Sequence, residues 1–76
     1  MKERIRDVIA DVVGASPEEI PLDAHQEAVA GWNSIRHMNL VIALEKEFQV
    51  RFSDLHIAEM MSIALIEDTI LEVGGK

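Results

Sequence analysis

The sequence contains no cysteine and no tyrosine, and its aromatic residues are one tryptophan and two phenylalanines. Without cysteine the chain can form neither a disulfide framework nor a thiolate nucleophile, and its composition agrees with a location in the reducing cytoplasm. No apolar run is long enough to cross a bilayer, so we expect no membrane insertion. Most of the first seven residues are charged and no continuous apolar segment follows them, which predicts that there is no signal peptide.

Basic residues are also scarce. Seven Lys and Arg stand against fourteen Asp and Glu, which gives a formal net charge of −7. The phosphate backbone would repel such a chain, so nucleic acid is not an expected partner. Proteins with basic docking patches would be attracted to it, although a need for solubility alone also explains an acidic balance.

The chain is short, and its length limits the function classes. Its 76 residues are enough for one domain, residues 1–76. A domain of this size buries only about 60% of the surface of its unfolded chain, which leaves little room for a deep, water-excluding active site. Three histidines, His25, His37 and His56, lack the spacing of metal ligands, and no calcium-binding loop is present. We therefore expect neither an enzyme nor a metal site.

Apolar residues recur at helical spacing in two long segments. Residues 2–13 have one apolar stripe with the 3.6-residue period of a helix, and Gly14 follows as the expected C-cap. Residues 34–48 form the second predicted helix, with Asn33 as its N-cap.

The rest of the chain predicts shorter elements. Ser53 can cap a short helix that ends near residue 61, and Ser62 can cap a last helix that ends in frayed residues 74–76. Residues 21–32 show no period and predict a long loop. The expected fold is therefore all-α: a small four-helix bundle with a long loop between helices one and two and a short third helix.

The helix predicted for residues 34–48 has apolar side chains on two opposite sides, at about 100° per residue. The side expected to face the core consists of Leu40, Leu44 and Phe48, with Val41 at its edge. The other side consists of Ile35, Met38 and Ile42. A helix of a small bundle needs only one apolar stripe. The second stripe therefore predicts a surface for docking other proteins, unless the loop of residues 21–32 covers it.

Ser34 stands at the predicted start of this helix. Serine is a preferred N-cap, but Asn33 caps equally well and leaves the hydroxyl of Ser34 free to point outward. Unpaired N–H groups and the helix dipole favour an anion at this end, and a phosphodiester would fit. His37 lies one turn further on, yet nothing in the sequence orients it as a base, and there is no Gly-x-Ser-x-Gly elbow. Ser34 is therefore predicted to be an attachment point, with no catalytic residue in the chain.

The serine and the helix after it fit a known pattern, because residues 33–35 read Asn-Ser-Ile and residues 43–48 read Ala-Leu-Glu-Lys-Glu-Phe. This segment resembles the phosphopantetheine attachment segment of acyl carrier proteins, in which Asp-Ser-Leu precedes an apolar helix ending in Ala-Leu-Glu-x-Glu-Phe. The similarity covers essentially the whole chain. It implies a bundle of the acyl-carrier type, in which Ser34 receives 4′-phosphopantetheine from coenzyme A through a Mg²⁺-dependent transferase. The thiol of that arm would then hold acyl groups as thioesters.

The same resemblance implies the partners and the docking residues. The partners would be a phosphopantetheinyl transferase and acyl-loading and acyl-transferring enzymes, and the carrier would be a monomer that binds no metal itself. Part of the acyl chain would lie between the helices. The predicted partner-docking residues are Ile35, Arg36, Met38, Ile42 and Glu45, and Asn33 would flank and cap the attachment serine. Trp32 is expected to pack into the loop, with a partner contact as the alternative reading.

Two departures from the family pattern qualify this prediction. Asn33 replaces the family's Asp, a carboxylate that helps the transferase recognise its target; we expect Ser34 to be modified nevertheless, with a matched transferase as one route. Arg36, His37, Asn39 and Lys46 replace residues of a helix that is acidic in carriers of fatty acid synthesis. The change predicts weaker binding to basic docking patches, and hence a specialised carrier in a lipid, polyketide-like or secondary acyl-transfer pathway.

Two alternatives stay open at this point. The first is an unmodified, carrier-like bundle that acts as a protein-interaction module, and Asn33 is the residue that favours it. The second is a small regulatory bundle, unrelated to acyl chemistry, that binds another protein through the second apolar stripe. Both alternatives differ from the carrier hypothesis because they predict that Ser34 bears no prosthetic group.

Overall fold

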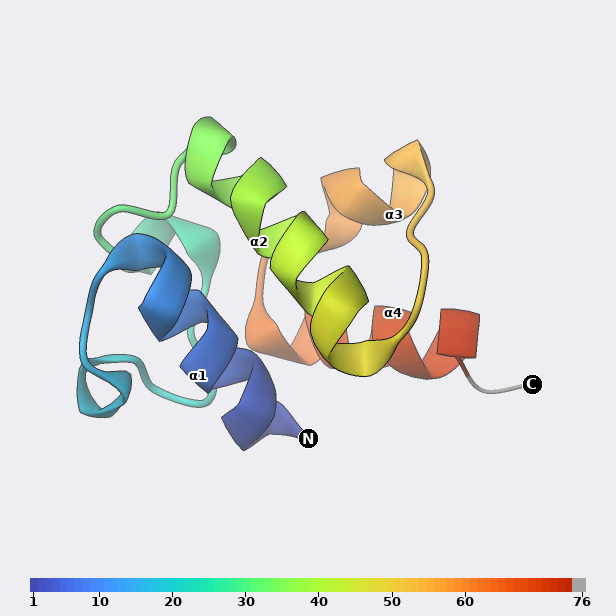
Figure 1. Ribbon diagram of the computed structural model, residues 1–76. Coiled ribbons are helices and arrows are strands. Elements are labelled where there is room, and N and C mark those ends of the chain that lie inside the picture. The colour runs from blue at the N-terminus through green and yellow to red at the C-terminus, as the bar shows by residue number, and fades with distance from the viewer. Residues whose placement is uncertain (75–76) are drawn as a thin grey trace.

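The computed structural model describes residues 1–74 and contains, within them, four helices and no strand. The helices are α1 (Lys2–Val13), α2 (Ser34–Phe48), α3 (Asp54–Glu59) and α4 (Ile63–Gly74), and two short 3-10 helices, η1 (Pro17–Glu19) and η2 (Gln26–Ala28), lie in the long connection between α1 and α2 (Figure 1). This confirms the predicted all-α bundle with its long loop and short third helix. None of these helices has the length and apolar character needed to span a bilayer.

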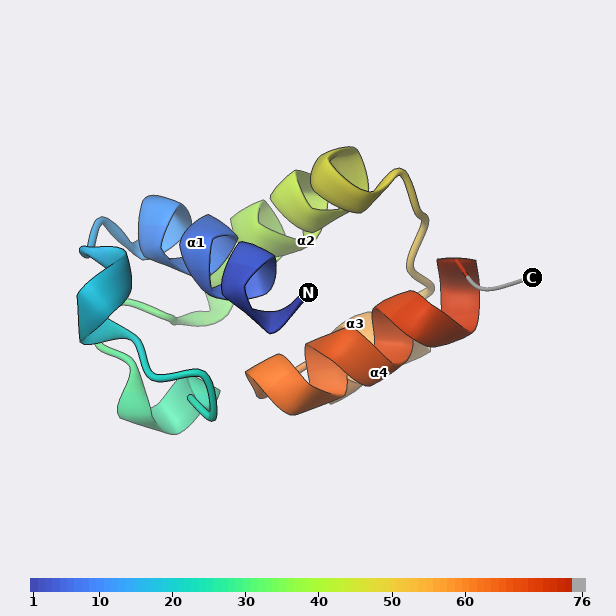
Figure 2. The same cartoon turned by 90° about the horizontal axis from the view of Figure 1, so that it is seen from below.

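The four helices enclose one apolar core. Figure 2 shows α1 and α2 side by side in one layer and α4 in a second, with α3 behind it. The stripe expected on α1 supplies Ile5 and Ile9 to this core, and the predicted core side of α2 supplies Leu40 and Leu44, all of them fully buried. The remaining buried hydrophobic residues are Ala10, Ile20, Ala24, Trp32, Val41, Met60, Ile63, Ile66 and Ile70.

The helix ends have the caps that the sequence predicts. The side chains of Asn33, Ser53 and Ser62 each accept a hydrogen bond from the backbone N–H three residues further on. Gly14 ends α1 with a φ of 77°, the left-handed conformation that glycine adopts without steric cost. The predicted frayed end lies outside the described residues, apart from Gly74, which is the last residue of α4.

The long loop has no helical period, yet tertiary contacts hold it in place at one end of the bundle. The backbone N–H of Gln26 donates to the carbonyl of Met61 at 2.8 Å, and that of Ile63 donates to the carbonyl of Ala24 at 3.1 Å. These bonds tie the loop to the connection between α3 and α4. At its end, Trp32 is only 4% exposed. Trp32 is therefore packed inside the protein, which argues against the alternative reading of a partner contact.

Candidate functional site

The start of α2 presents an exposed hydroxyl. Ser34 is the first residue of the helix and is exposed. Asn33 supplies the cap, since its side-chain oxygen accepts a hydrogen bond from the backbone N–H of Arg36 at 2.9 Å. Within residues 1–74, the backbone N–H groups of Ser34 and Ile35 make no hydrogen bond. One hydroxyl and two free donors at the positive end of a helix dipole fit a phosphodiester attached to the serine.

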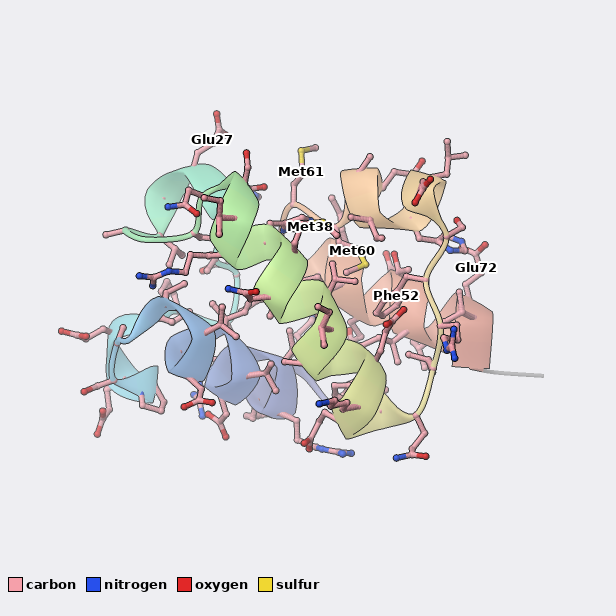
Figure 3. The ribbon with its side chains drawn as sticks, turned by 45° about the horizontal axis from the view of Figure 1, so that its top comes forward. Glu27, Met38, Phe52, Met60, Met61 and Glu72 are labelled. Carbon is pink, nitrogen blue, oxygen red and sulfur yellow. The ribbon has the colours of Figure 1, made fainter. Side chains whose placement is uncertain are left out.

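The second apolar side of α2 lies open along the helix from this serine. Ile35 is 76% exposed, Met38 49% and Ile42 52%. The loop of residues 21–32 therefore leaves this side uncovered, which the sequence alone could not decide. We call these three residues the outer stripe. Figure 3 shows Met38 on this helix and Met61, which is also half exposed, on the connection between α3 and α4.

The charged side chains near the outer stripe make contacts within the protein. The guanidinium of Arg36 donates to the carbonyl of Val12 at 3.2 Å and so satisfies an acceptor in the last turn of α1. The carboxylate of Glu45 accepts from the backbone N–H of Phe52 at 2.9 Å, in the connection that leads to α3. Docking roles for Arg36 and Glu45 stay predictions, but both side chains have a structural contact that sequence reasoning missed.

His37 is oriented by two partners that the sequence did not indicate. The indole Nε1–H of Trp32 donates to His37 Nδ1 at 2.9 Å, and His37 Nε2 lies 2.9 Å from the carbonyl oxygen of Ile57. The Trp32 and His37 rings are stacked with their centroids 6.1 Å apart. Both ring nitrogens are thus engaged away from Ser34, and no hydrogen bond joins His37 to Ser34 in the described part of the chain. The arrangement gives the serine no general base.

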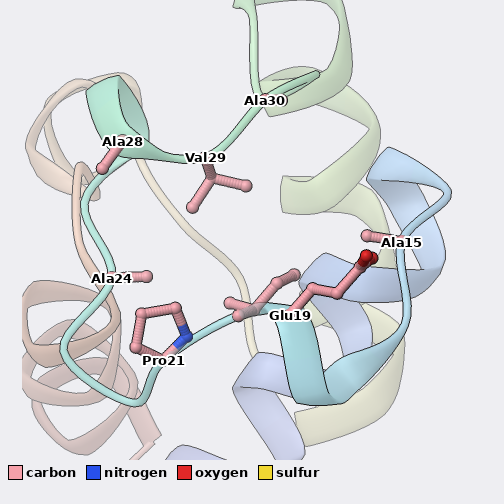
Figure 4. Close-up of a pocket in the computed structure, with 8 residues that line it drawn as sticks. Ala15, Glu19, Pro21, Ala24, Ala28, Val29 and Ala30 are labelled. Carbon is pink, nitrogen blue, oxygen red and sulfur yellow. The ribbon is translucent and has the colours of Figure 1, made fainter.

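No metal site accompanies the serine in the described residues, which contain no group of three or more His, Asp or Glu side chains placed to hold an ion. A separate pocket of about 320 Å³ opens in the long loop (Figure 4). Half of its eight lining residues are alanines, namely Ala15, Ala24, Ala28 and Ala30. No residue of α2 lines it, so it is distinct from the site at Ser34.

A small helical bundle that holds an exposed serine hydroxyl at a helix start fits one class of protein, the carrier domain that presents a covalently attached group. Comparison with known proteins identifies the class. The family model described as "Phosphopantetheine attachment site" matches residues 3–70. Three proteins named acyl carrier protein are similar over most of their length. That of Campylobacter curvus is 29% identical over 92% of this chain and 91% of its own, and that of Akkermansia muciniphila is 27% identical over 99% and 94%. That of Clostridium acetobutylicum is 30% identical over 80% and 79%.

The chain therefore belongs to the family of phosphopantetheine-carrying acyl carrier proteins. The cofactor of this family is 4′-phosphopantetheine, attached covalently. Its members are carriers and not enzymes, in agreement with a site that offers a hydroxyl and no base.

Proposed function

We propose that Ser34 is the residue that bears 4′-phosphopantetheine and that the protein carries acyl groups on this arm. The observation that carries the proposal is the exposed hydroxyl of Ser34 beside two free backbone N–H groups at the start of α2. In the transfer, Ser34 Oγ bonds to the phosphorus of the phosphopantetheine half of coenzyme A, and the phosphoanhydride bond breaks. Adenosine 3′,5′-bisphosphate leaves, and the hydroxyl proton goes to a base of the transferase. The bound group supplies a thiol that holds the cargo as a thioester.

The competing reading is a bundle that is never modified and serves as an interaction module. Asn33 favours this alternative, because it keeps the cap but lacks the carboxylate of the family pattern. The cap itself is intact, with the Asn33 oxygen 2.9 Å from the N–H of Arg36. Since the local geometry of the attachment serine is thereby preserved, we expect modification to need only a transferase that tolerates the missing charge.

Intact-protein mass spectrometry separates these readings. The apo protein is incubated with coenzyme A, Mg²⁺ and a transferase of broad specificity, and the expected result is a mass increase of one phosphopantetheine. Ser34→Ala should abolish the increase. Ser16→Ala is the matched control, because Ser16 is also exposed at a helix start, and it should be modified like the wild type. An unmodified wild type would favour the interaction module.

We further propose that the carrier serves a specialised lipid, polyketide-like or secondary acyl-transfer pathway. The support is the chemistry of α2: the outer stripe is apolar, and the side chains beside it are Arg36, His37 and Asn39 instead of carboxylates. Enzymes that dock a carrier through basic patches gain little attraction from such a surface. In a reconstituted fatty acid elongation assay, this protein should replace the housekeeping carrier poorly, and efficient replacement would contradict the proposal.

One partner at a time is expected at this surface. The phosphopantetheinyl transferase and the acyl-loading and acyl-transferring enzymes would each contact the outer stripe of a monomeric carrier in the cytoplasm. Binding should then be competitive, so that an inactive transferase added in excess slows acyl loading. Simultaneous binding of two such partners to one carrier would contradict a shared surface.

A further inference from the structure

The hydrogen-bonded chain from Trp32 through His37 to Ile57 has no role in the attachment described above. An indole N–H can only donate, so His37 Nδ1 must accept at 2.9 Å. The ring proton of His37 therefore lies on Nε2, which donates to the Ile57 carbonyl at 2.9 Å. The three residues form a continuous chain in which every polar group is satisfied when the imidazole is neutral.

This series of hydrogen bonds connects α2 to α3 next to the proposed attachment point. His37 follows Ser34 by three residues, so the two lie on adjacent positions of the same helix face. The bond from His37 to Ile57 is the one hydrogen bond between α2 and α3 within residues 1–74. Helix α3 has six residues and none of them is fully buried, so few other contacts hold it against α2. The His37 side chain therefore supplies the one hydrogen bond that the described residues form across the seam between α2 and α3, beside the partly buried side chain of Ile57.

Apolar core lies directly beneath that seam. Leu40 follows His37 by one turn on α2, and Met60 follows Ile57 at the end of α3; both are almost completely buried. The thioether of Met60 is flexible and can move aside for another apolar group. An acyl chain that enters the core from Ser34 between α2 and α3 must displace α3. It then breaks the His37–Ile57 bond and leaves two polar groups without partners.

We propose that Trp32, His37 and Ile57 form a latch that determines which acyl groups stay outside the bundle, an inference that rests on the proposed attachment at Ser34. The arm holds its cargo at high effective concentration beside the seam. Each buried methylene adds a similar favourable increment, whereas the cost of opening the latch is fixed. A threshold chain length follows. Short or polar acyl groups remain in water, accessible to partner enzymes, and they are the cargo class that this carrier suits.

The test compares chain-length thresholds. Wild type and His37→Phe are each loaded with acetyl, butyryl, hexanoyl and octanoyl arms, and the amide signals of Leu40, Leu44 and Met60 are followed by NMR. Phenylalanine keeps an aromatic ring but can form neither the hydrogen bond to Trp32 nor the one to Ile57. The shortest acyl group that shifts the core signals should be shorter in His37→Phe, by roughly two carbons, because opening no longer leaves the His37 and Ile57 polar groups without partners. Equal thresholds would overturn the latch.

Two further measurements separate the latch from general destabilisation and from failed attachment. Val12→Ala trims a half-buried side chain of α1, which belongs to neither helix of the seam, and it should keep the wild-type threshold; a shift equal to that of His37→Phe would refute the latch. In the apo protein, the indole proton of Trp32, the only tryptophan, should exchange about tenfold faster in His37→Phe because it has lost its acceptor. Unchanged exchange would also refute it. Failure of the arm to attach is visible in the protein mass before any spectrum is taken.

Discussion

The two sides of α2 have similar side chains and opposite surroundings. On the inner side, Leu40, Val41 and Leu44 are at most 3% exposed, whereas the outer stripe on the other side is 49% exposed or more. The difference lies in the neighbours, because α1, α4 and the loop can cover only one side of the helix. A bundle of this size has enough apolar surface for a single core. The second stripe stays in contact with water, which is costly unless a partner covers it.

The comparison assigns a different physical role to each side. Burial on the inner side removes apolar surface from water on folding and so contributes to the free energy of unfolding. The outer stripe buries its own apolar surface only when a partner binds. That burial therefore contributes to the free energy of association. Substitutions should therefore change stability on the inner side and binding on the outer side, and variants that violate this division would break the comparison.

The largest effect is expected for Leu44→Ala on the inner side. Leu44 is fully buried, so the substitution leaves a cavity and should lower the free energy of unfolding by about 2–5 kcal/mol. Urea denaturation followed by circular dichroism measures the change. Ile42→Ala is the matched control on the outer stripe and should cost well under half as much, since its side chain is 52% exposed. Equal losses for both variants would mean that the two sides do not differ in energetic role.

The helices and the exposed position of Ser34 at a helix start could be predicted from the sequence because local signals specify them. Residues 2–13 and 34–48 have a clear 3.6-residue period, and Gly14 and Asn33 are strong end signals. The helix bounds in the structure agree with these ranges. The position of Ser34 follows from the same cap, because an asparagine in front of it takes over the hydrogen bond that serine would otherwise accept.

The contacts around the site could not be predicted, because they join residues that no local pattern relates. Trp32 and His37 are five residues apart, across a helix boundary, and the other partner of His37 is a backbone carbonyl in α3. The contact of Arg36 with Val12 spans 24 residues. A backbone acceptor leaves no side-chain signal in a sequence, so these bonds appear only once the helices are packed.

A smaller effect is expected at the start of α2, where Asn33 caps the helix. Asn33→Ala removes the oxygen that accepts from the N–H of Arg36 and should lower the free energy of unfolding by about 1 kcal/mol. Asn33→Asp keeps the cap, adds a negative charge at the positive end of the helix and should raise stability slightly. Thermal unfolding of the three proteins measures both. If alanine were as stable as asparagine, the cap would not hold the helix start that presents Ser34.

Arg36 sharpens the comparison, because it is a predicted docking residue with a structural contact. Arg36→Met keeps the apolar stem and loses the hydrogen bond to the Val12 carbonyl, so we expect roughly 0.5–1 kcal/mol lower stability. The KM of the transferase for the carrier should change little if this side chain serves α1 alone. Steady-state kinetics with the apo protein measures it, and Lys46→Met is the control for loss of one positive charge from the same helix. A large rise in KM for Arg36→Met alone would show that the guanidinium also contacts partners.

The smallest effect on stability, and the sharpest separation of the two sides, is expected for Ile42→Asp. The side chain is half exposed, and the new carboxylate stands four residues before Lys46, a favourable helical pair, so the free energy of unfolding should change by no more than about 0.5 kcal/mol. Partner binding should instead weaken roughly tenfold, because a charge would be buried against an apolar contact. Transferase kinetics on a variant with unchanged urea unfolding measures this. Asn39→Asp is the control, since it adds the same charge next to the outer stripe without removing one of its side chains, and it should weaken binding much less. If both variants weakened binding equally, charge alone would govern docking, and the outer stripe would not be the surface that partners contact.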